Sequence, residues 1–293
     1  MPAELIDGAA VALKIRTAVA LSTEALLARG VRPGLSVLLV GDDAASAVYV
    51  RSKERACVAA GMRGETIRLP ASTTEAELLS RIHALNADHR VHGILVQMPL
   101  PPAINAQSVI RHISPEKDVD GVHPMNVGKV LIGDSEAFAP CTPLGVQALL
   151  REYGVDTRGK ECVIIGRSIL VGKPMASLLM QAGEGADATV TVCHSRTTDL
   201  AWHTRRADIL IAAAGRAEII TGDMVKPGAV VIDVGINRVL DPTAKSGARL
   251  LGDVHFASVR EVASKITPVP GGVGPMTIAM LLSNTVRAAE RVA

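Results

Sequence analysis

The chain has 293 residues, of which 48% are hydrophobic and 20% are charged, so it is long enough for about two domains with buried cores. Its 31 basic and 29 acidic residues leave a net charge of +2, which argues against nucleic acid or a membrane surface as the main partner. No apolar run is long enough to span a bilayer, and aromatic residues at 2% leave almost no platform for stacking bases.

The first half of the chain alternates helix-like and strand-like segments. Apolar periodicity predicts helices over residues 9–29, from the turn at 41–43 to about 61, and over 74–87. Continuous apolar runs predict strands over residues 35–40, 65–69 and 91–97. This β-α-β rhythm indicates a mostly parallel sheet covered by helices.

A Pro- and Gly-rich stretch from Ser114 to Pro143 follows, and we interpret it as the crossing between two domains. Thr142-Pro143 has the form of a helix start and predicts a helix to about Tyr153. A second β-α series then follows, with strands predicted over residues 161–165, 188–193, 208–213 and 229–234. Residues 236–253 indicate a hairpin or arm, and a helix over about 275–290 closes the chain. The predicted fold is α/β, with two β-α-β domains of mostly parallel sheet and a cleft between them.

The remaining composition places the protein in a reducing compartment. The cysteines lie far apart and form no Cys-x-x-Cys pair; they are Cys57, Cys141, Cys162 and Cys193. We therefore expect reduced thiols in a cytosol, with neither a disulfide framework nor a zinc site. The first eight residues have the pattern of neither a signal peptide nor a transit peptide. The histidines form no metal-ligand cluster, so no metal is expected.

Tyr49 and Lys53 lie one helical turn apart in the helix predicted after residue 43. Together with Ser46 they occupy positions i, i+3 and i+7, which share one helix face. Val50 and Cys57 lie near this face, and partial burial would lower the pKa of Lys53 toward a range useful for proton transfer. A Tyr-x-x-x-Lys pair also suggests a short-chain dehydrogenase, but there the nucleotide-binding glycines come first in the chain. A solvated lysine beside a core tyrosine is the non-functional alternative.

Two further polar residues belong to the same predicted domain. Gln97 stands at the carboxyl end of an apolar strand, where parallel sheets place ligands, and its amide both donates and accepts hydrogen bonds. Asp120 lies in an acidic turn before Gly121, where a carboxylate can bind adjacent N–H donors such as those of a 2-amino-pyrimidinone ring. Turn capping explains Asp120 equally well from the local sequence.

A glycine turn joins the strand predicted at 161–165 to the next helix. It runs from Gly166 through Arg167 and Ser168 to Gly172, and Pro174 suits the first turn of a helix. Free backbone N–H groups at such a helix start form a ready phosphate site. The spacing is neither the standard dinucleotide fingerprint nor a P-loop, so a bare structural turn is the alternative.

The end of the following strand indicates which coenzyme this site takes. In a dinucleotide fold that position faces the adenosine ribose, and an acidic residue there selects NAD. This chain has Ser195 and Arg196 instead, with Arg167 in the preceding turn. Hydroxyl and guanidinium donors favour a 2′-phosphate and hence NADP, with a solvated loop arginine as the alternative.

Another glycine-rich segment, Pro270-Gly271-Gly272-Val273-Gly274, precedes the last helix. Three glycines in four residues permit a ligand to approach the backbone closely, and the helix start suits an anion. A simple connecting loop is the alternative.

Taken together, these motifs resemble the bifunctional methylenetetrahydrofolate dehydrogenase/methenyltetrahydrofolate cyclohydrolase family over nearly the whole chain. In the first half the matching motifs are Ser46-x-x-Tyr49-Val-x-x-Lys53, Val96-Gln97-Met98-Pro99-Leu100-Pro101 and Lys117-Asp118-Val119-Asp120-Gly121. In the second half they are Gly166-Arg167-Ser168, Val171-Gly-Lys-Pro174, His194-Ser-Arg-Thr197, Asp233-Val-Gly-Ile-Asn237 and Pro268-Val-Pro-Gly-Gly-Val-Gly-Pro-Met-Thr277.

The resemblance implies residue roles. Lys53 would be the catalytic lysine, assisted by Gln97, while Tyr49 stacks on the folate. Asp120 would bind the pterin and completes the implied catalytic group. The implied folate-binding set is Ser46, Tyr49, Lys53, Val96, Gln97, Met98, Asp120, Pro270, Gly271, Gly272, Val273 and Gly274. The implied NADP-binding set is Gly166, Arg167, Ser168, Ser195, Arg196 and Ile236.

The resemblance also implies an activity and a domain plan. NADP would oxidise 5,10-methylenetetrahydrofolate to 5,10-methenyltetrahydrofolate, and hydrolysis would give 10-formyltetrahydrofolate, within cytoplasmic one-carbon metabolism. Residues 1–120, completed by the C-terminal helix 275–293, would form the folate-binding catalytic domain. Residues 140–270 would form a Rossmann-like NADP domain. A homodimer is expected, with the 236–253 arm as a candidate contact.

Two alternatives explain part of the sequence. A shikimate-type dehydrogenase accounts for the NADP turn, but it does not account for Lys53 with Gln97 and the 270–274 segment. A non-catalytic NADP-binding protein or scaffold leaves Lys53 without a role.

Overall fold

Residues 2–242 and 247–293, which the computed structural model describes, form two units, each with its own sheet. The six-stranded unit contains residues 2–12 and Thr142–Thr277, and the three-stranded unit contains Leu13–Cys141 and Ile278–Ala293. This division differs from the predicted boundaries at the N-terminus. The first residues belong to the six-stranded unit because strand β1 (Glu4–Leu5) pairs with β11 (Lys265–Ile266).

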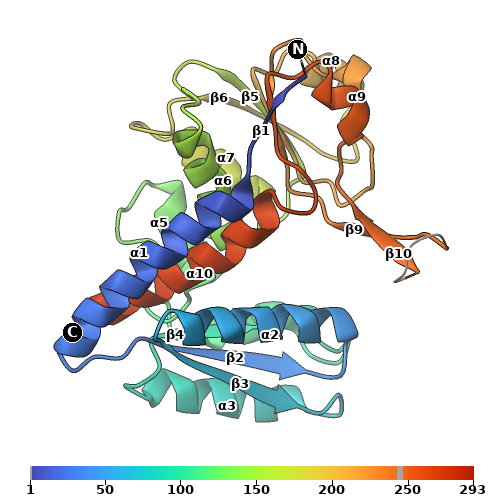
Figure 1. The fold of residues 1–293 in the computed structure, drawn as a ribbon. Coiled ribbons are helices and arrows are strands. Elements are labelled where there is room, and N and C mark those ends of the chain that lie inside the picture. The colour runs from blue at the N-terminus through green and yellow to red at the C-terminus, as the bar shows by residue number, and fades with distance from the viewer. Residues whose placement is uncertain (1, 243–246) are drawn as a thin grey trace. The chain divides into compact units, whose positions relative to one another are not determined.

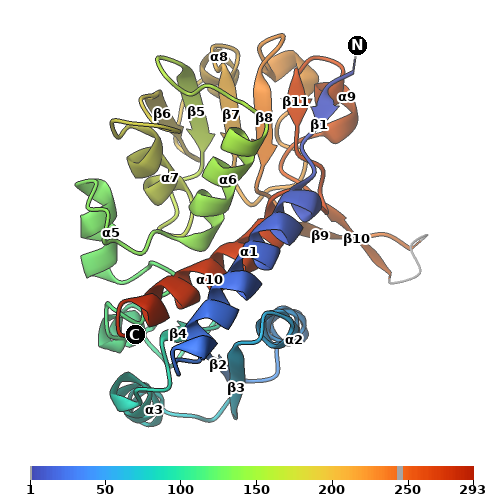
Figure 2. The same ribbon diagram turned by 60° about the vertical axis from the view of Figure 1, so that its left-hand side comes forward.

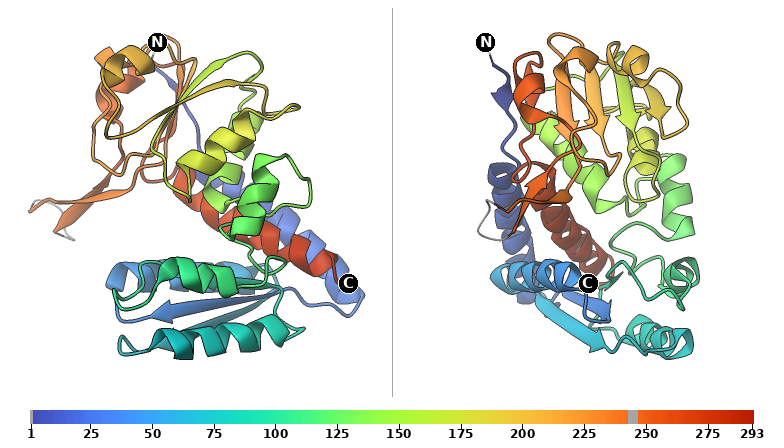
Figure 3. Two further views of the ribbon diagram at one scale, coloured as in Figure 1. Left: turned by 180° about the vertical axis from the view of Figure 1, so that it is seen from behind. Right: turned by 90° about the vertical axis from the view of Figure 1, so that its right-hand side faces the viewer.

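The three-stranded unit is a parallel sheet with helices on both faces (Figures 1 and 3). Its strands lie in the order β3-β2-β4, with bounds β2 Gly34–Val40, β3 Arg63–Leu69 and β4 Gly93–Val96. Its helices are α2 (Ala44–Ala59), α3 (Glu75–Ala87), α4 (Ala106–His112) and α5 (Pro124–Leu131), with parts of α1 (Gly8–Ala28) and α10 (Val273–Glu290). The sequence did not predict α4 or α5.

Strand β2 shows why the sheet is covered on both sides, since all seven of its residues are buried. Side chains alternate along a strand, so Leu35, Val37 and Leu39 pack on the same side as α2. Leu38 and Val40 pack on the other side, with the buried residues of α3. A continuous apolar run at 35–40 is therefore what a strand between two helix layers requires.

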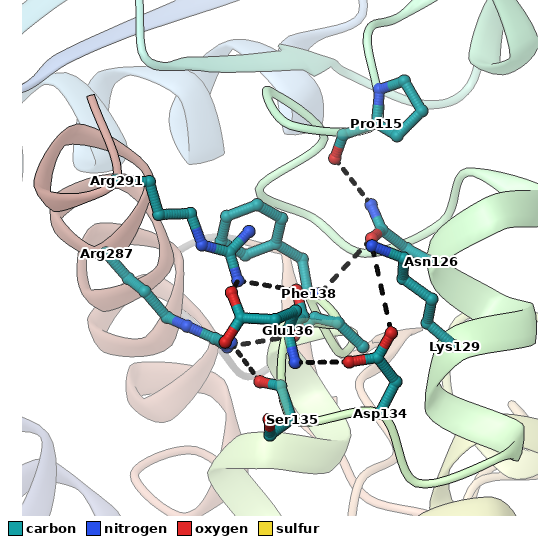
Figure 4. Close-up of polar contacts among 10 residues, drawn as sticks. Pro115, Asn126, Lys129, Asp134, Ser135, Glu136, Phe138, Arg287 and Arg291 are labelled. Carbon is teal, nitrogen blue, oxygen red and sulfur yellow. Dashed lines mark hydrogen bonds and ion pairs between the residues drawn. The ribbon is translucent and has the colours of Figure 1, made fainter.

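Two arginines at the C-terminal end of α10 bind residues 135–138 (Figure 4). The guanidinium groups of Arg287 and Arg291 lie 5.4 and 4.4 Å from the centre of the Phe138 ring. Arg291 also pairs with Glu136 at 3.0 Å, and Arg287 donates to the carbonyl of Ala137 at 2.9 Å. These contacts hold the last turn of α10 against its own unit.

The six-stranded unit is an open parallel sheet in the order β1-β11-β8-β7-β5-β6 (Figure 2). Besides β1 and β11, its strands are β5 Glu161–Ile165, β6 Thr189–Cys193, β7 Ile209–Ala212 and β8 Val230–Asp233. Its helices are α6 Cys141–Glu152, α7 Gly172–Leu179, α8 Leu200–Thr204, the short η1 Gly222–Met224 and α9 Phe256–Arg260. The two units confirm the predicted α/β class with mostly parallel sheets.

The predicted arm contains an antiparallel hairpin of β9 (Asn237–Leu240) and β10 (Ala248–Leu251). Residues 243–246 of that arm lie outside the described residues. Leu240 on β9 is 85% exposed, so this hairpin presents apolar surface. Among the described residues, no helix combines the length and the apolarity needed to cross a membrane.

Candidate functional site

A polar cluster lies at the carboxyl ends of β2 and β4 in the three-stranded unit. Helix α2 starts there because the Asp43 carboxylate accepts a hydrogen bond from the Ser46 backbone N–H at 2.7 Å. Two helical turns after Ser46, the Lys53 Nζ donates to Gln97 Oε1 at 2.9 Å. The amide nitrogen of Gln97 in turn donates to the Met98 carbonyl at 2.8 Å, which fixes the orientation of the amide. The structure thus brings Lys53 and Gln97 together from segments 44 residues apart.

The surroundings of Lys53 change its acid–base chemistry. Burial lowers the pKa of the Lys53 ammonium, and the negative charge of Asp120 opposes this decrease. Burial raises the pKa of the Asp120 carboxyl, which the Lys53 cation opposes. The two groups therefore influence each other. Val50 and Cys57, on the same helix as Lys53, are themselves buried, being 0% and 1% exposed.

The two carboxylates of the acidic turn, Asp118 and Asp120, have different hydrogen-bond partners. Asp118 accepts hydrogen bonds from the backbone N–H groups of Val122 and His123, at 3.2 and 2.8 Å, and from the Asn126 amide at 2.8 Å. Turn capping was the alternative role considered for Asp120. In the structure Asp118 caps the turn. The Asp120 carboxyl is left facing Lys53 and Cys141.

The remaining predicted folate contacts divide between the two units. Tyr49 is 45% exposed on α2, and Ser46 is buried with its hydroxyl 3.4 Å from the Met98 carbonyl. Val96 is the last residue of β4 and is buried. Residues 270–274 belong to the six-stranded unit, where the Ala9 N–H donates to the Gly271 carbonyl at 3.0 Å.

The predicted coenzyme turn lies where the order of the six-stranded sheet reverses. Chain order runs outward from β5 to β6 on one side and to β7 and β8 on the other, so the switch point lies between β5 and β7. Open parallel sheets bind ligands at the carboxyl edge of this point. Gly166 follows β5 there with φ at 124°, and a Cβ on it would lie 2.1 Å from the Ala213 carbonyl oxygen.

Helix α7 starts directly behind this turn. A Cβ on Gly172 would lie 2.0 Å from the Gly166 carbonyl oxygen, so the turn and the helix start touch. Val171 at the N-cap supplies no side-chain hydrogen bond to the first turn of the helix. The Lys173 N–H donates to the Ser168 carbonyl at 3.1 Å and Pro174 has no N–H, so the Gly172 N–H is the donor of this helix start that fits a coenzyme phosphate.

The other predicted coenzyme contacts lie at neighbouring strand ends. Gly166 N–H donates to the Cys193 carbonyl at 2.8 Å, so the β5 turn adjoins the end of β6. Ser195 and Arg196 follow β6 and are exposed, as are Arg167 and Ser168 after β5. Ile236, after β8, is 44% exposed. Polar donors from adjacent strands thus lie at one edge of the sheet.

Sequence reasoning missed a pair of buried carboxylates at this edge. Asp253 accepts hydrogen bonds from the backbone N–H groups of Ala214, Gly215 and Arg216 at 2.5 to 3.0 Å, which fixes the loop after β7. Asp233 accepts from three further backbone N–H groups, at residues 235, 253 and 254, at 2.9 to 3.0 Å. Asp233 begins the motif Asp233-Val-Gly-Ile-Asn237, and Asp253 follows Gly252. Nothing in the local sequence reveals which backbone N–H groups these two carboxylates bind.

No described group of three or more His, Cys, Asp or Glu side chains is arranged to hold a metal ion. The four cysteines are free and buried.

Two family models match the chain. One, described as tetrahydrofolate dehydrogenase/cyclohydrolase, catalytic domain, matches residues 6–120. The other, described as tetrahydrofolate dehydrogenase/cyclohydrolase, NAD(P)-binding domain, matches residues 140–293. Together the two models leave little of the chain unmatched.

Relatives and solved structures agree over the full length. The bifunctional protein FolD of Bordetella petrii is 59% identical, with 99% of this chain and 95% of that protein covered. The protein of the same name from Moorella thermoacetica is 56% identical, with 99% and 100% covered. A crystal structure of the Campylobacter jejuni bifunctional FolD enzyme gives a TM-score of 0.93 at 48% identity, covering 99% of both chains. A Trypanosoma brucei FolD structure, complexed with NADP and an inhibitor, gives 0.94 at 43% identity, covering 100% and 99%.

Proposed function

The chain belongs to the tetrahydrofolate dehydrogenase/cyclohydrolase family, and we propose that it carries out both reactions that this name joins. It oxidises 5,10-methylenetetrahydrofolate to the 5,10-methenyl form with NADP and hydrolyses that product to 10-formyltetrahydrofolate. The observation that carries the proposal is the Lys53–Gln97 pair at 2.9 Å, with Asp120 close enough to affect the pKa of Lys53. A shikimate-type enzyme is set aside because both halves of the chain match models of this family.

The dehydrogenase step depends mainly on positioning, because the folate nitrogens themselves stabilise the cation that forms. NADP supplies the hydride acceptor when it is bound. Gly166 and the uncapped start of α7 would hold its phosphates, and Ser195 with Arg196 would bind the 2′-phosphate. Arg167, Ser168 and Ile236 complete the proposed contact set. Tyr49, half-exposed on α2, presents its ring to the folate.

The cyclohydrolase step needs proton transfers, which the Lys53 amine suits. Water adds to the methenyl carbon and loses one proton, and the C–N5 bond then breaks while N5 takes up a proton. Lys53, with its lowered pKa, exchanges these protons, and Gln97 holds the amine in place. Asp120 accepts hydrogen bonds from the N–H groups of the pterin ring.

The domain plan, the assembly and the location extend this proposal. Folate binding and catalysis are assigned to residues 1–120 with the C-terminal helix 275–293, and NADP binding to residues 140–270.

The β9–β10 hairpin, with Leu240 exposed, is the proposed contact of a homodimer. Four buried, free thiols fit a reducing cytoplasm. Sedimentation of the wild type beside Leu240→Lys tests the dimer, which the charged side chain is expected to weaken.

The activity is tested by absorbance with 5,10-methylenetetrahydrofolate and either NADP or NAD. NADPH and the methenyl product are expected to appear with NADP, and the methenyl absorbance is then expected to decay as hydrolysis proceeds. NAD is expected to support much slower turnover, because Ser195 and Arg196 leave no acidic partner for its ribose. No turnover with either coenzyme would refute the proposed function.

Lys53→Met separates the two activities from coenzyme binding. Cyclohydrolase activity is expected to fall by about 100-fold or more, since the variant has no group that exchanges protons. NADP affinity is expected to stay within about twofold of the wild type, because the proposed NADP contacts lie in the other unit. Lys160→Met, which changes an exposed lysine before β5, is the matched control and is expected to keep both activities. Unchanged hydrolysis in Lys53→Met would remove Lys53 from the mechanism.

A further inference from the structure

A cavity of about 430 Å³ lies in the three-stranded unit, away from every residue assigned above. Its wall is formed by the segments that precede β2 and β4, by residues 116–117 before the acidic turn, and by the end of α10 with the residues after it. Gln97, the hydrogen-bond partner of Lys53, directly follows the carboxyl end of β4. Strands β2 and β4 are parallel. The cavity therefore lies at the amino ends of these strands, and Gln97, with its partner Lys53, lies toward their carboxyl ends.

The deepest polar group in the cavity wall is His92, which is only 7% exposed. Its Nδ1 accepts a hydrogen bond from the Gly34 backbone N–H at 3.1 Å. The neutral ring must therefore carry its proton on Nε2. No described residue accepts a hydrogen bond from Nε2, and this nitrogen is not among the fully buried unpaired atoms, so its N–H can donate to a ligand in the cavity.

Cationic side chains line the same cavity as His92. The Lys117 ammonium donates to the carbonyls of Leu85 and Asp88 at 3.1 and 2.8 Å, which keeps it in the wall with one further proton to donate. The Arg32 guanidinium is anchored by Nε alone, which donates to the Gly61 carbonyl at 3.1 Å. Its two terminal nitrogens have no partner among the described residues.

The other charges of the wall are partly balanced. Arg90 is paired with Asp88 at 2.8 Å, and Arg291 with Glu136 at 3.0 Å (Figure 4). Glu116 is the single carboxylate that lines the cavity, and it is exposed. The donors without a full set of partners include those of Arg32, Lys117 and His92, which together favour an anion with several acceptor oxygens.

We propose that this cavity is a second ligand site, which binds a small phosphate-bearing anion. A phosphate group offers oxygens to a guanidinium, an ammonium and an imidazole N–H at once, whereas a chloride ion offers a single centre. The volume lies at the lower end of the range for small-molecule pockets, which suits one or two phosphates rather than a whole dinucleotide. The site is independent of the proposed catalytic function.

The test uses the full chain saturated with NADP, so that phosphate sites of the coenzyme are already filled. Inorganic pyrophosphate and orthophosphate are titrated separately, and sodium chloride at matched ionic strength is the screening control. The Gly34 amide and the His92 ring nitrogens are followed by ¹H–¹⁵N NMR. Saturable shifts at both residues below about 10 mM phosphate or pyrophosphate are expected. Shifts that stay linear, or that chloride reproduces, would overturn the proposal.

Three variants locate the binding. Arg32→Ala is expected to weaken pyrophosphate binding about tenfold, as the loss of a charge-assisted hydrogen bond predicts. Arg32→Lys keeps the charge without the Nε contact to Gly61, and its affinity is expected to lie between those of the wild type and Arg32→Ala. Arg81→Ala, which removes an exposed arginine of α3 outside the cavity, is the matched control and is expected to change nothing. Equal weakening in Arg81→Ala, or none in Arg32→Ala, would refute the site.

Discussion

An amine that exchanges protons near neutral pH needs surroundings that disfavour its cation, and Lys53 has them. Its hydrogen-bond acceptor is the neutral amide of Gln97 instead of a carboxylate, and its side chain is partly buried. A lysine in a surface ion pair has the opposite environment, because the carboxylate stabilises the ammonium form. The proximity of Asp120 moderates the effect without cancelling it.

Asp120→Asn is therefore expected to move the pH dependence of hydrolysis to lower pH. The substitution removes a negative charge that raises the pKa of Lys53, so the neutral amine forms at lower pH. We expect the ascending limb of kcat to shift by about half a pH unit or more. Methenyl absorbance at saturating folate measures kcat directly, which matters because Asp120 is also a proposed pterin ligand.

Glu54→Gln is the matched control for this shift. Glu54 follows Lys53 on α2 and is also acidic, but its carboxylate accepts a hydrogen bond from the Thr66 hydroxyl at 3.2 Å and does not influence the pKa of Lys53. Its pH profile is expected to match the wild type. A profile of Asp120→Asn that moves to higher pH would contradict the account of Lys53.

The first residue of α7 must be glycine, because position 172 has no room for a side chain. A methyl group on Gly172 would meet the Gly166 carbonyl oxygen at 2.0 Å, so the turn must open to admit it. We expect Gly172→Ala to lower the free energy of unfolding by about 1–3 kcal/mol, as overpacking does, and to weaken NADP binding. Urea unfolding and a fluorescence titration with NADPH measure the two effects.

Gly128→Ala provides the control with the same chemical change. A Cβ at this position of α5 meets no atom within 4 Å. Alanine is the better helix former, so the free energy of unfolding is expected to rise by about 0.5–1 kcal/mol with NADP affinity unchanged. Unimpaired NADPH binding in Gly172→Ala would show that the turn does not hold the coenzyme.

The loop after β7 depends on Asp253 in a comparable way. Its carboxylate accepts from three consecutive backbone N–H groups and from the Asn237 amide at 2.9 Å. In Asp253→Asn an NH₂ group faces one of these donors, so we expect the loop to loosen and KM for NADP to rise about tenfold. Cyclohydrolase activity, which uses no coenzyme, is the internal control. An equal loss of both activities would indicate general unfolding instead.

Local signals decide which elements the sequence predicts. Strand β5 is found with its observed bounds, Glu161–Ile165, because an apolar run ends at a glycine. Helix α5 was missed inside the Pro- and Gly-rich stretch, although Pro124 at its first position and the His123 side chain, which accepts from Met125 N–H at 3.0 Å, start it. A histidine N-cap has no distinctive sequence pattern, so this start is not recognised in advance.

Strand pairing between segments far apart in the chain is the part of the fold that the sequence does not predict. Strand β1 is two residues long and exists because Glu4 and Leu5 pair with Lys265 and Ile266 at the other end of the chain. No pattern over two residues reports such a partner. Lys53 and Gln97 are linked in advance only by the family resemblance; the structure adds the hydrogen bond between their side chains, and the role of the pair stays a prediction.

The same burial that shapes the sites makes the stability of the whole protein depend on pH. Burial raises the pKa of Asp118 to about 7 and that of Asp233 to about 6, against an ordinary value of 3.8. The folded chain thus keeps protons that the unfolded chain releases. The resulting stabilisation is complete below about pH 4 and is lost as pH rises through 6 and 7.

Asp118→Asn is expected to flatten this dependence. Because asparagine does not titrate, the difference in unfolding free energy between pH 5 and pH 7 is expected to shrink by about 2 kcal/mol. Urea unfolding at closely spaced pH values gives this difference, whatever constant destabilisation the amide causes by facing the N–H groups of Val122 and His123. Asp42→Asn, at an exposed position, is the control and is expected to keep the slope of the wild type. An unchanged slope in Asp118→Asn would mean that this carboxyl is already ionised in the folded protein at pH 5, because its three hydrogen-bond donors outweigh its burial.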